Sequence, residues 1–120
     1  MSKYFSAAEF RRCTQSCSIE QMADRFLSIM DEVRERAGIP LVVTSAYRSR
    51  EWEREHKRTG NSAHPRGVAM DIRCNTSNNR WRISRAALAV GIRRIGIGKN
   101  YLHLDCDDSL PQNVIWHYYD

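Results

Sequence analysis

The residues with the most distinctive chemistry are two imidazoles and a carboxylate that stand apart in the chain. His64 and Asp71 enclose the small residues Gly67 and Ala69, and His103 follows much later. Two imidazole nitrogens and one carboxylate oxygen form a common ligand set for Zn2+ when a fourth position stays open for water. Zinc sites of this kind carry out hydrolysis. The sequence therefore indicates a hydrolytic zinc site, provided that the fold brings the three side chains together.

Two apolar runs predict the strands that would position these side chains, over 68–72 and 101–106. Alternate side chains of a strand share a face, so Asp71 points to one face of the first strand. On the second strand His103 shares a face with Asp105. His64 lies in the loop before the first strand and can fold back over Asp71, because Gly67 lets the chain turn.

The other elements follow from capping residues and hydrophobic periodicity. The pattern predicts helices over about 6–12, 18–37, 49–57 and 79–90, with strands over 41–45, 95–97 and 114–118. Ser18 and Gly38 bound the second helix, and Asn79 caps the last one. Helices come first and strands dominate later, with short links between them. We therefore expect a single domain over 1–120 of the α+β class. Its sheet is mostly antiparallel, with N-terminal helices packed on one face and the zinc site on the other.

Basic residues dominate one half of the chain. The net charge is +5, and between Ile72 and Leu104 there is no acidic residue but seven basic ones: Arg73, Arg80, Arg82, Arg85, Arg93, Arg94 and Lys99. Such a stretch attracts polyanions, with nucleic acid and anionic cell-wall polymer as candidates, or it forms a solvated helix face. Nucleic-acid binding is disfavoured, because beyond Trp81 we find neither interleaved aromatics nor a recognition helix.

Membrane insertion and a disulfide scaffold are both disfavoured. No stretch is long and apolar enough to span a membrane, and the first ten residues lack the layout of a signal peptide. The four cysteines are too few and too irregular for a disulfide framework. Cys74 and Cys106 each follow a proposed ligand by three positions, so they should point away from the metal. We hypothesise that they face each other beneath the sheet.

The motif around His64 resembles that of the M15 zinc peptidases. The family pattern S-x-H-x-x-G-x-A-x-D matches at every position, and the final ligand of the family matches His103; the matched positions are Ser62, His64, Gly67, Ala69 and Asp71. Upstream, the stretch 44–49 resembles the S-G-Y-R-S segment of the family, whose arginine lies at the active site and corresponds to Arg48. The resemblance covers nearly the whole chain and is strongest with the compact subgroup of the family; the hedgehog signalling domain shares the fold.

The resemblance implies roles for four residues, and the position of Asp105 beside His103 suggests a fifth. Zinc would be bound by His64, Asp71 and His103. Arg48 would bind a substrate carboxylate or stabilise the oxyanion. The alternative for Arg48 is a surface ion pair with Glu51 or another acid. Some members place an acid three residues before the last ligand as the base, where this chain has Asn100. Asp105 is the substitute, either as the base or as a residue that orients the metal site. His117 is a weaker ligand candidate than His103.

The function implied is that of a zinc metallopeptidase that hydrolyses peptidoglycan stem peptides. It would act as a D-Ala-D-Ala carboxypeptidase or as an endolysin-like L-Ala-D-Glu endopeptidase. The alternative is a non-catalytic cell-wall-binding module that retains the fold and the metal site. We expect a monomer, made in the bacterial cytoplasm without a visible signal peptide, that acts at the cell wall on stem peptides and meets anionic wall polymer through its basic face.

Overall fold

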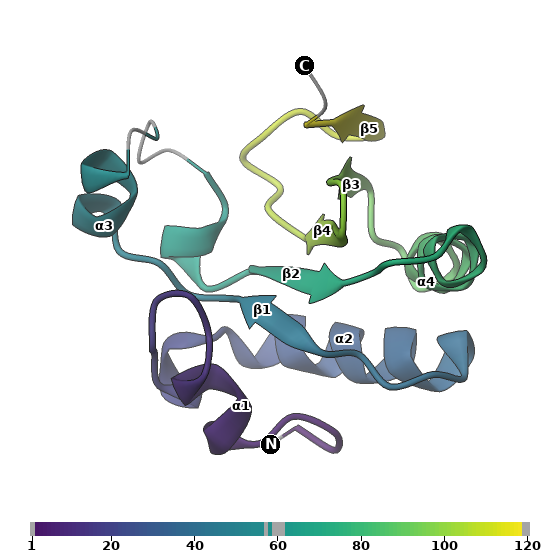
Figure 1. Ribbon diagram of the computed structural model, residues 1–120, viewed down its shortest axis with the longest axis horizontal. Helices are drawn as coiled ribbons and strands as arrows, with labels where there is room; N and C mark the ends of the chain where they lie inside the picture. Colours follow the sequence, from purple (N-terminus) through teal and green to yellow (C-terminus); the bar gives the residue numbers. More distant parts are fainter. Residues whose placement is uncertain (1, 57, 59–61, 119–120) are drawn as a thin grey trace.

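A five-stranded sheet with the strand order β1-β2-β4-β3-β5 forms the centre of the molecule (Figure 1). The computed structural model describes residues 2–56, 58 and 62–118. The strands are β1 (Val43–Ser45), β2 (Ala69–Arg73), β3 (Arg94–Ile97), β4 (Tyr101–Asp105) and β5 (Val114–His117). All neighbouring strands are antiparallel except β3 and β5, which are parallel. The mostly antiparallel sheet is thus as the sequence predicts.

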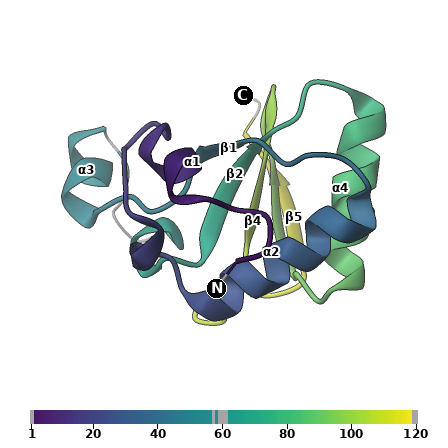
Figure 2. The same ribbon diagram turned by 90° about the horizontal axis from the view of Figure 1, so that it is seen from below.

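Helices surround this sheet. They are α1 (Ala7–Arg11), α2 (Asp24–Ala37), α3 (Arg50–Glu55) and α4 (Ser77–Ala89), with the 3-10 turns η1 (Ile19–Gln21) and η2 (His64–Arg66). The helices α2 and α4 pack against each other, and Figure 2 shows them on one side of the sheet, with α3 on the other. The α+β class is confirmed. The placement of the N-terminal helices on the face opposite the metal site stays a prediction. Within the described residues no helix has the length and apolar character that crossing a membrane requires.

The predicted helix over 18–37 is interrupted near its start. Ser18 caps only the short turn η1, and α2 begins after Ala23, whose backbone is extended. The reason is a tertiary contact: the Ala23 amide donates to the carbonyl of Gly67 at 2.9 Å, which ties this segment to the loop that carries His64. From there the apolar side chains of Phe26, Met30, Val33 and Ala37 are buried, and Gly38 ends the helix with a left-handed backbone.

Two further boundaries differ from those expected. The helix α4 is capped by Thr76, whose hydroxyl accepts from the Asn79 amide, so Asn79 lies inside the first turn. Ser49 caps α3 as predicted, but the helix ends at Glu55, and the predicted end at Lys57 lies outside the described residues.

Alternation along β2 and β4 separates the core from the site. Met70, Ile72, Leu102 and Leu104 are all fully buried in the hydrophobic core. Each such side chain contributes roughly 1.5–3 kcal/mol on burial. A register slip of one residue would drive Asp71 into the core, so the apolar set fixes which face carries the polar side chains.

Cys74 and Cys106 do not face each other beneath the sheet, so the hypothesis that they do is wrong. Cys74 donates its amide to the carbonyl of Asn100, whereas Cys106 donates to that of Val68. Because β2 and β4 are antiparallel, these two contacts lie at opposite ends of the strand pair. All four cysteines are free thiols.

Gly67 has both a left-handed backbone and no space for a side chain, so replacing it with alanine should destabilise the protein. Its φ is 72°, and an added Cβ would collide with the carbonyl oxygen of Gln21. A left-handed non-glycine residue costs roughly 1–3 kcal/mol, and the collision adds to this. We expect Gly67→Ala to lower the free energy of unfolding, measured by urea denaturation, by more than about 2 kcal/mol. The control is Gly91→Ala, which has a φ of 94° but open space around it. Equal losses for the two variants would contradict the packing argument.

Candidate metal centre

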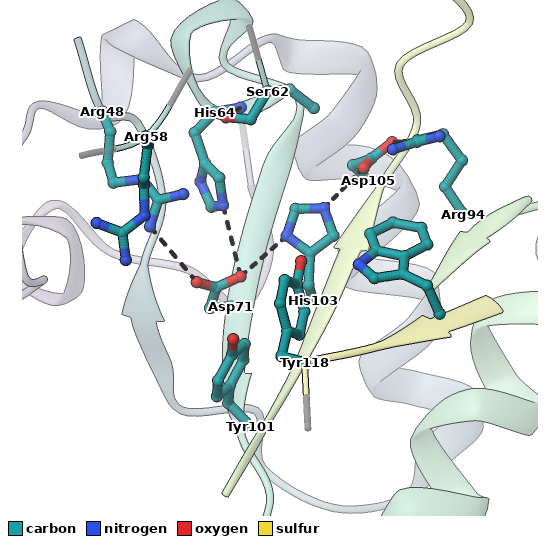
Figure 3. Close-up of a pocket in the computed structure, with 12 residues that line it drawn as sticks. Arg48, Arg58, Ser62, His64, Asp71, Arg94, Tyr101, His103, Asp105 and Tyr118 are labelled. Atoms are coloured by element: carbon teal, nitrogen blue, oxygen red, sulfur yellow. Dashed lines mark hydrogen bonds and ion pairs between the residues drawn. The ribbon is translucent and has the colours of Figure 1, made fainter. Parts of the chain in front are cut away.

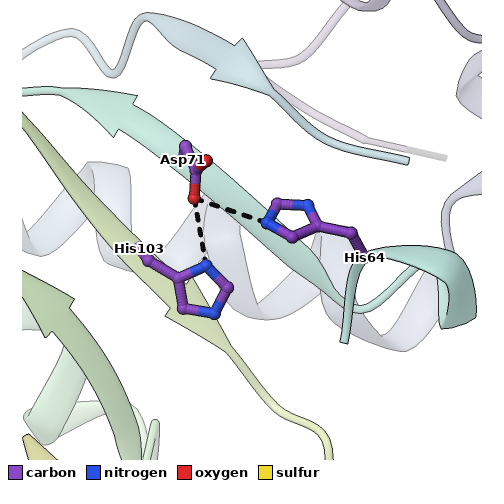
Figure 4. A group of neighbouring side chains, drawn as sticks. All are labelled: His64, Asp71 and His103. Atoms are coloured by element: carbon purple, nitrogen blue, oxygen red, sulfur yellow. Dashed lines mark hydrogen bonds and ion pairs between the residues drawn. The ribbon is translucent and has the colours of Figure 1, made fainter. Parts of the chain in front are cut away.

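Three side chains that are distant in sequence converge beside β2 and β4 (Figure 4). Asp71 and His103 are direct partners in the antiparallel register, and His64 begins η2 just before β2. One ligand atom from each of the three residues lies within 4.8 Å of the others. The structure therefore brings together the three ligands that the sequence proposes, with N, O and N donors around one point.

His64 offers its Nε2 atom to this point. Its Nδ1 contacts the backbone carbonyl of Ala46; because a carbonyl only accepts, Nδ1 carries the ring hydrogen and Nε2 keeps its lone pair. Nε2 is buried, lies 3.5 Å from Asp71 Oδ1, and makes no hydrogen bond among the described residues. A buried nitrogen without a partner is costly unless something else binds it. A cation beside Asp71 would satisfy it, so the donor set fits a metal.

His103 offers its Nδ1 atom to the same point, whereas His64 offers Nε2. Its Nδ1 lies 3.0 Å from Asp71 Oδ1, and its Nε2 lies 2.7 Å from Asp105 Oδ2. Figure 3 shows Asp105 on the far side of the His103 ring from Asp71. Metal-binding histidines commonly donate their second ring N–H to a carboxylate, which fixes the ring orientation and raises its basicity.

Both oxygens of Asp105 are engaged. Besides the contact with His103, its Oδ1 accepts from Arg94 Nε at 2.8 Å and from the Asp107 amide at 3.0 Å. The residue is fully buried. Three contacts thus hold Asp105 behind His103, on the side away from the other two proposed ligands.

The family assignment rests on a comparison with known proteins. The model of the family described as Peptidase M15 matches residues 3–107, which is most of the chain. The chain belongs to the peptidase M15 family. A search of curated proteins found no match. The matched range of this M15 domain includes η2, β2 and β4, which carry His64, Asp71 and His103, and it leaves β5 outside. Membership supports a hydrolase of the peptidase class, in a family whose members are generally zinc-dependent.

We call His64, Asp71 and His103 the triad of this M15 domain. In the zinc-free protein a proton on His103 balances the negative charge of Asp71. Burial disfavours the charged form of His103, but its hydrogen bonds to Asp105 and Asp71 outweigh this and raise its pKa to about 9. Burial lowers the pKa of His64 despite the nearby Asp71. Burial likewise opposes ionisation of Asp71, yet the two imidazoles hold the pKa of this carboxyl well below its usual range. The protonated ring of His103 therefore carries the positive charge beside Asp71 that a bound cation would carry in its place.

Zinc affinity should consequently depend on pH. A group whose pKa is raised from 6.5 to about 9 holds a proton below pH 9, and a zinc ion that binds His103 would have to displace this proton. We expect the apparent zinc affinity to rise about tenfold per pH unit up to about pH 8 and to level off around pH 9. By the same linkage, the zinc-free protein loses stability as the pH rises from 6.5 to about 9. Chelator competition and thermal melts at pH 6.5, 7.5 and 8.5 measure both trends. A pH-independent zinc affinity would contradict the proton on His103.

Arg48 is buried beside the triad rather than exposed on the surface. Its Nη2 lies 3.1 Å from Glu53 Oε2, and its Nη1 lies 3.7 Å from Asp71 Oδ2. The ion-pair partner is thus Glu53 instead of Glu51. The sequence carries a signal for this partner: on a helix capped by Ser49, Glu51 and Glu55 share one face, which leaves Glu53 on the opposite, inward side.

A cavity of about 190 Å³ opens beside the triad of the M15 domain. Its walls carry three arginines and three aromatic side chains: Arg48, Arg58, Arg94, Tyr101, Trp116 and Tyr118. The centroid of the Trp116 ring lies 5.5 Å from that of the His103 ring and 4.8 Å from the Arg94 guanidinium carbon. Most of this wall could not be predicted from the sequence, because it depends on the pairing of β5 with β3. Asn100 does not line the cavity, and His117, the weaker ligand candidate, is exposed on β5.

Proposed function

We propose that this M15 domain is a zinc-dependent peptidase that hydrolyses the stem peptides of peptidoglycan. The observation that carries the proposal is the buried Nε2 of His64, which faces Asp71 without a hydrogen bond while the other nitrogen of the ring is held by Ala46. In this proposal His64 Nε2, Asp71 Oδ1 and His103 Nδ1 hold the metal. When bound, zinc supplies a Lewis acid and a water whose pKa falls toward about 7.

The residues around the triad have separate proposed tasks. We assign Asp105 the orienting task instead of that of the base, since its oxygens are taken up by His103, Arg94 and the Asp107 amide. Arg48 places a positive charge next to Asp71, where it can stabilise the negative charge that develops on the substrate carbonyl.

The cavity wall favours an anionic peptide as substrate. Besides Arg48, the guanidinium groups of Arg58 and Arg94 line a space next to the triad, and guanidinium binds carboxylates at two points. Both bonds under consideration, D-Ala-D-Ala and L-Ala-D-Glu, lie beside free carboxylates of the stem peptide. We propose that the protein acts as a monomer at the cell wall and that its basic residues on and after α4 meet anionic wall polymer.

Digestion of purified peptidoglycan, followed by mass spectrometry of the products, tests the proposed activity. Loss of a terminal D-Ala identifies a carboxypeptidase, and release of peptides that begin at D-Glu identifies an endopeptidase. The variant Asp71→Asn, which removes the anionic ligand, should be inactive in the same assay. A wild-type protein that binds zinc but leaves the products unchanged would overturn the proposal.

The second candidate function is a cell-wall-binding module without catalysis. The observation that favours it is Asn100, which replaces the acid that some members of the family place three residues before the final ligand. Zinc-loaded protein that sediments with peptidoglycan but releases no product would support this candidate.

A further inference from the structure

A closed chain of contacts runs behind two of the three metal-binding side chains. Asp71 Oδ2 faces Arg48 at 3.7 Å, and Arg48 reaches Glu53 at 3.1 Å. Glu53 accepts from the Ser62 hydroxyl at 2.6 Å, and the same hydroxyl accepts from the His64 amide at 3.4 Å. His64 Nε2 closes the chain at 3.5 Å from Asp71 Oδ1. Asp71 and His64 are thus connected twice, once directly and once through three residues.

Glu53 is the residue on which this chain depends. A single oxygen, Oε2, accepts from both Arg48 and Ser62, which belong to segments on either side of α3. The residue is fully buried, and its other oxygen, Oε1, has no hydrogen-bond partner among the described residues. Burial of a carboxylate is costly unless its charge is paired, so the position of Glu53 is defined by Arg48 and Ser62.

We infer that Glu53 is a positioning residue for the metal centre: it holds Arg48 against Asp71 and Ser62 against the His64 backbone, and so fixes two ligands from behind. Nothing in the motif around His64 assigns a task to this residue. The inference rests on the proposed function for its activity readout, but zinc binding tests it independently. It also gives Ser62, the first residue of that motif, a partner outside its own loop.

The test compares Glu53→Gln with Ser62→Ala and with the double variant. Groups that support metal ligands from outside typically alter metal affinity or activity 10–100-fold, so we expect Glu53→Gln to weaken zinc binding at least about tenfold in chelator competition. We expect kcat to fall as well, with KM changed less than about twofold, because Arg48 would act in the transition state. The double variant should bind zinc no more weakly than Glu53→Gln, since both changes cut the same chain.

The matched control is Glu51→Gln, which removes an exposed carboxylate from the same helix. It should bind zinc as the wild type does. If Glu53→Gln does not fold, Glu53→Asp keeps the charge but withdraws it by one methylene, and we expect it to weaken zinc binding too. Variants that melt at lower temperature yet bind zinc with wild-type affinity would overturn the inference, as would additive effects of Glu53→Gln and Ser62→Ala. If the wild type fails to cleave peptidoglycan, the proposed function falls, and the zinc measurements still decide the task of Glu53.

Discussion

Replacing His103 with alanine is expected to abolish zinc binding at micromolar concentrations and, with it, peptide hydrolysis. The ring offers Nδ1 to the point shared with Asp71 and His64, and no other imidazole or thiol in the described part of the chain joins that cluster. Zinc binding to a protein site contributes about 10–16 kcal/mol, so each of three protein ligands accounts for roughly 3–5 kcal/mol. The zinc affinity should therefore fall about 1,000-fold, as measured by competition with a chromophoric chelator.

His117→Ala is the matched control for this prediction. His117 is the other late histidine, and it lies exposed on β5. We expect this variant to bind zinc and to cleave its substrate like the wild type. The assignment of His103 would be contradicted if His117→Ala lost zinc while His103→Ala kept it.

The second large effect is expected for Asp105→Asn. If Asp105 orients His103, its loss weakens zinc binding about 10–100-fold, and saturating zinc restores most of the activity. If Asp105 is instead the base, zinc affinity stays near that of the wild type while kcat falls about 100–10,000-fold at every zinc concentration. Because both oxygens of Asp105 already have partners, we expect the first outcome. Activity and chelator competition measured on one preparation separate the two.

Asp108→Asn is the control here, because Asp108 is an exposed acid three residues further along the same segment. It removes the same charge without touching His103. Equal losses for the two variants would show that net charge, and not the contact with His103, controls the site.

The part of the site that lies on strands could be predicted from the sequence because strand alternation is a local rule. Two apolar runs fix the faces of β2 and β4, and Asp71 and His103 then become direct neighbours in the register. The loop motif adds His64, since Gly67 has the left-handed backbone that the turn requires. Zinc ligation itself stays a prediction.

The parts that could not be predicted depend on contacts between distant segments. The helix α2 starts late because Ala23 bonds to Gly67, a contact that no capping rule contains. Arg48 lies 3.7 Å from Asp71 because β1, which precedes Arg48, pairs with β2. The aromatic wall forms because β5 joins β3 in parallel and lays Trp116 over Gly96, where an added Cβ would meet the Trp116 and Tyr118 rings.

The measurement that tests the central claim most directly is a crystal structure of the zinc-loaded protein with anomalous scattering recorded at the zinc edge. We predict one strong peak within bonding distance of His64 Nε2, an Asp71 carboxylate oxygen and His103 Nδ1, with Asp105 still on the opposite nitrogen of His103. A zinc ion bound elsewhere, or an empty triad in protein that retains zinc in solution, would contradict it.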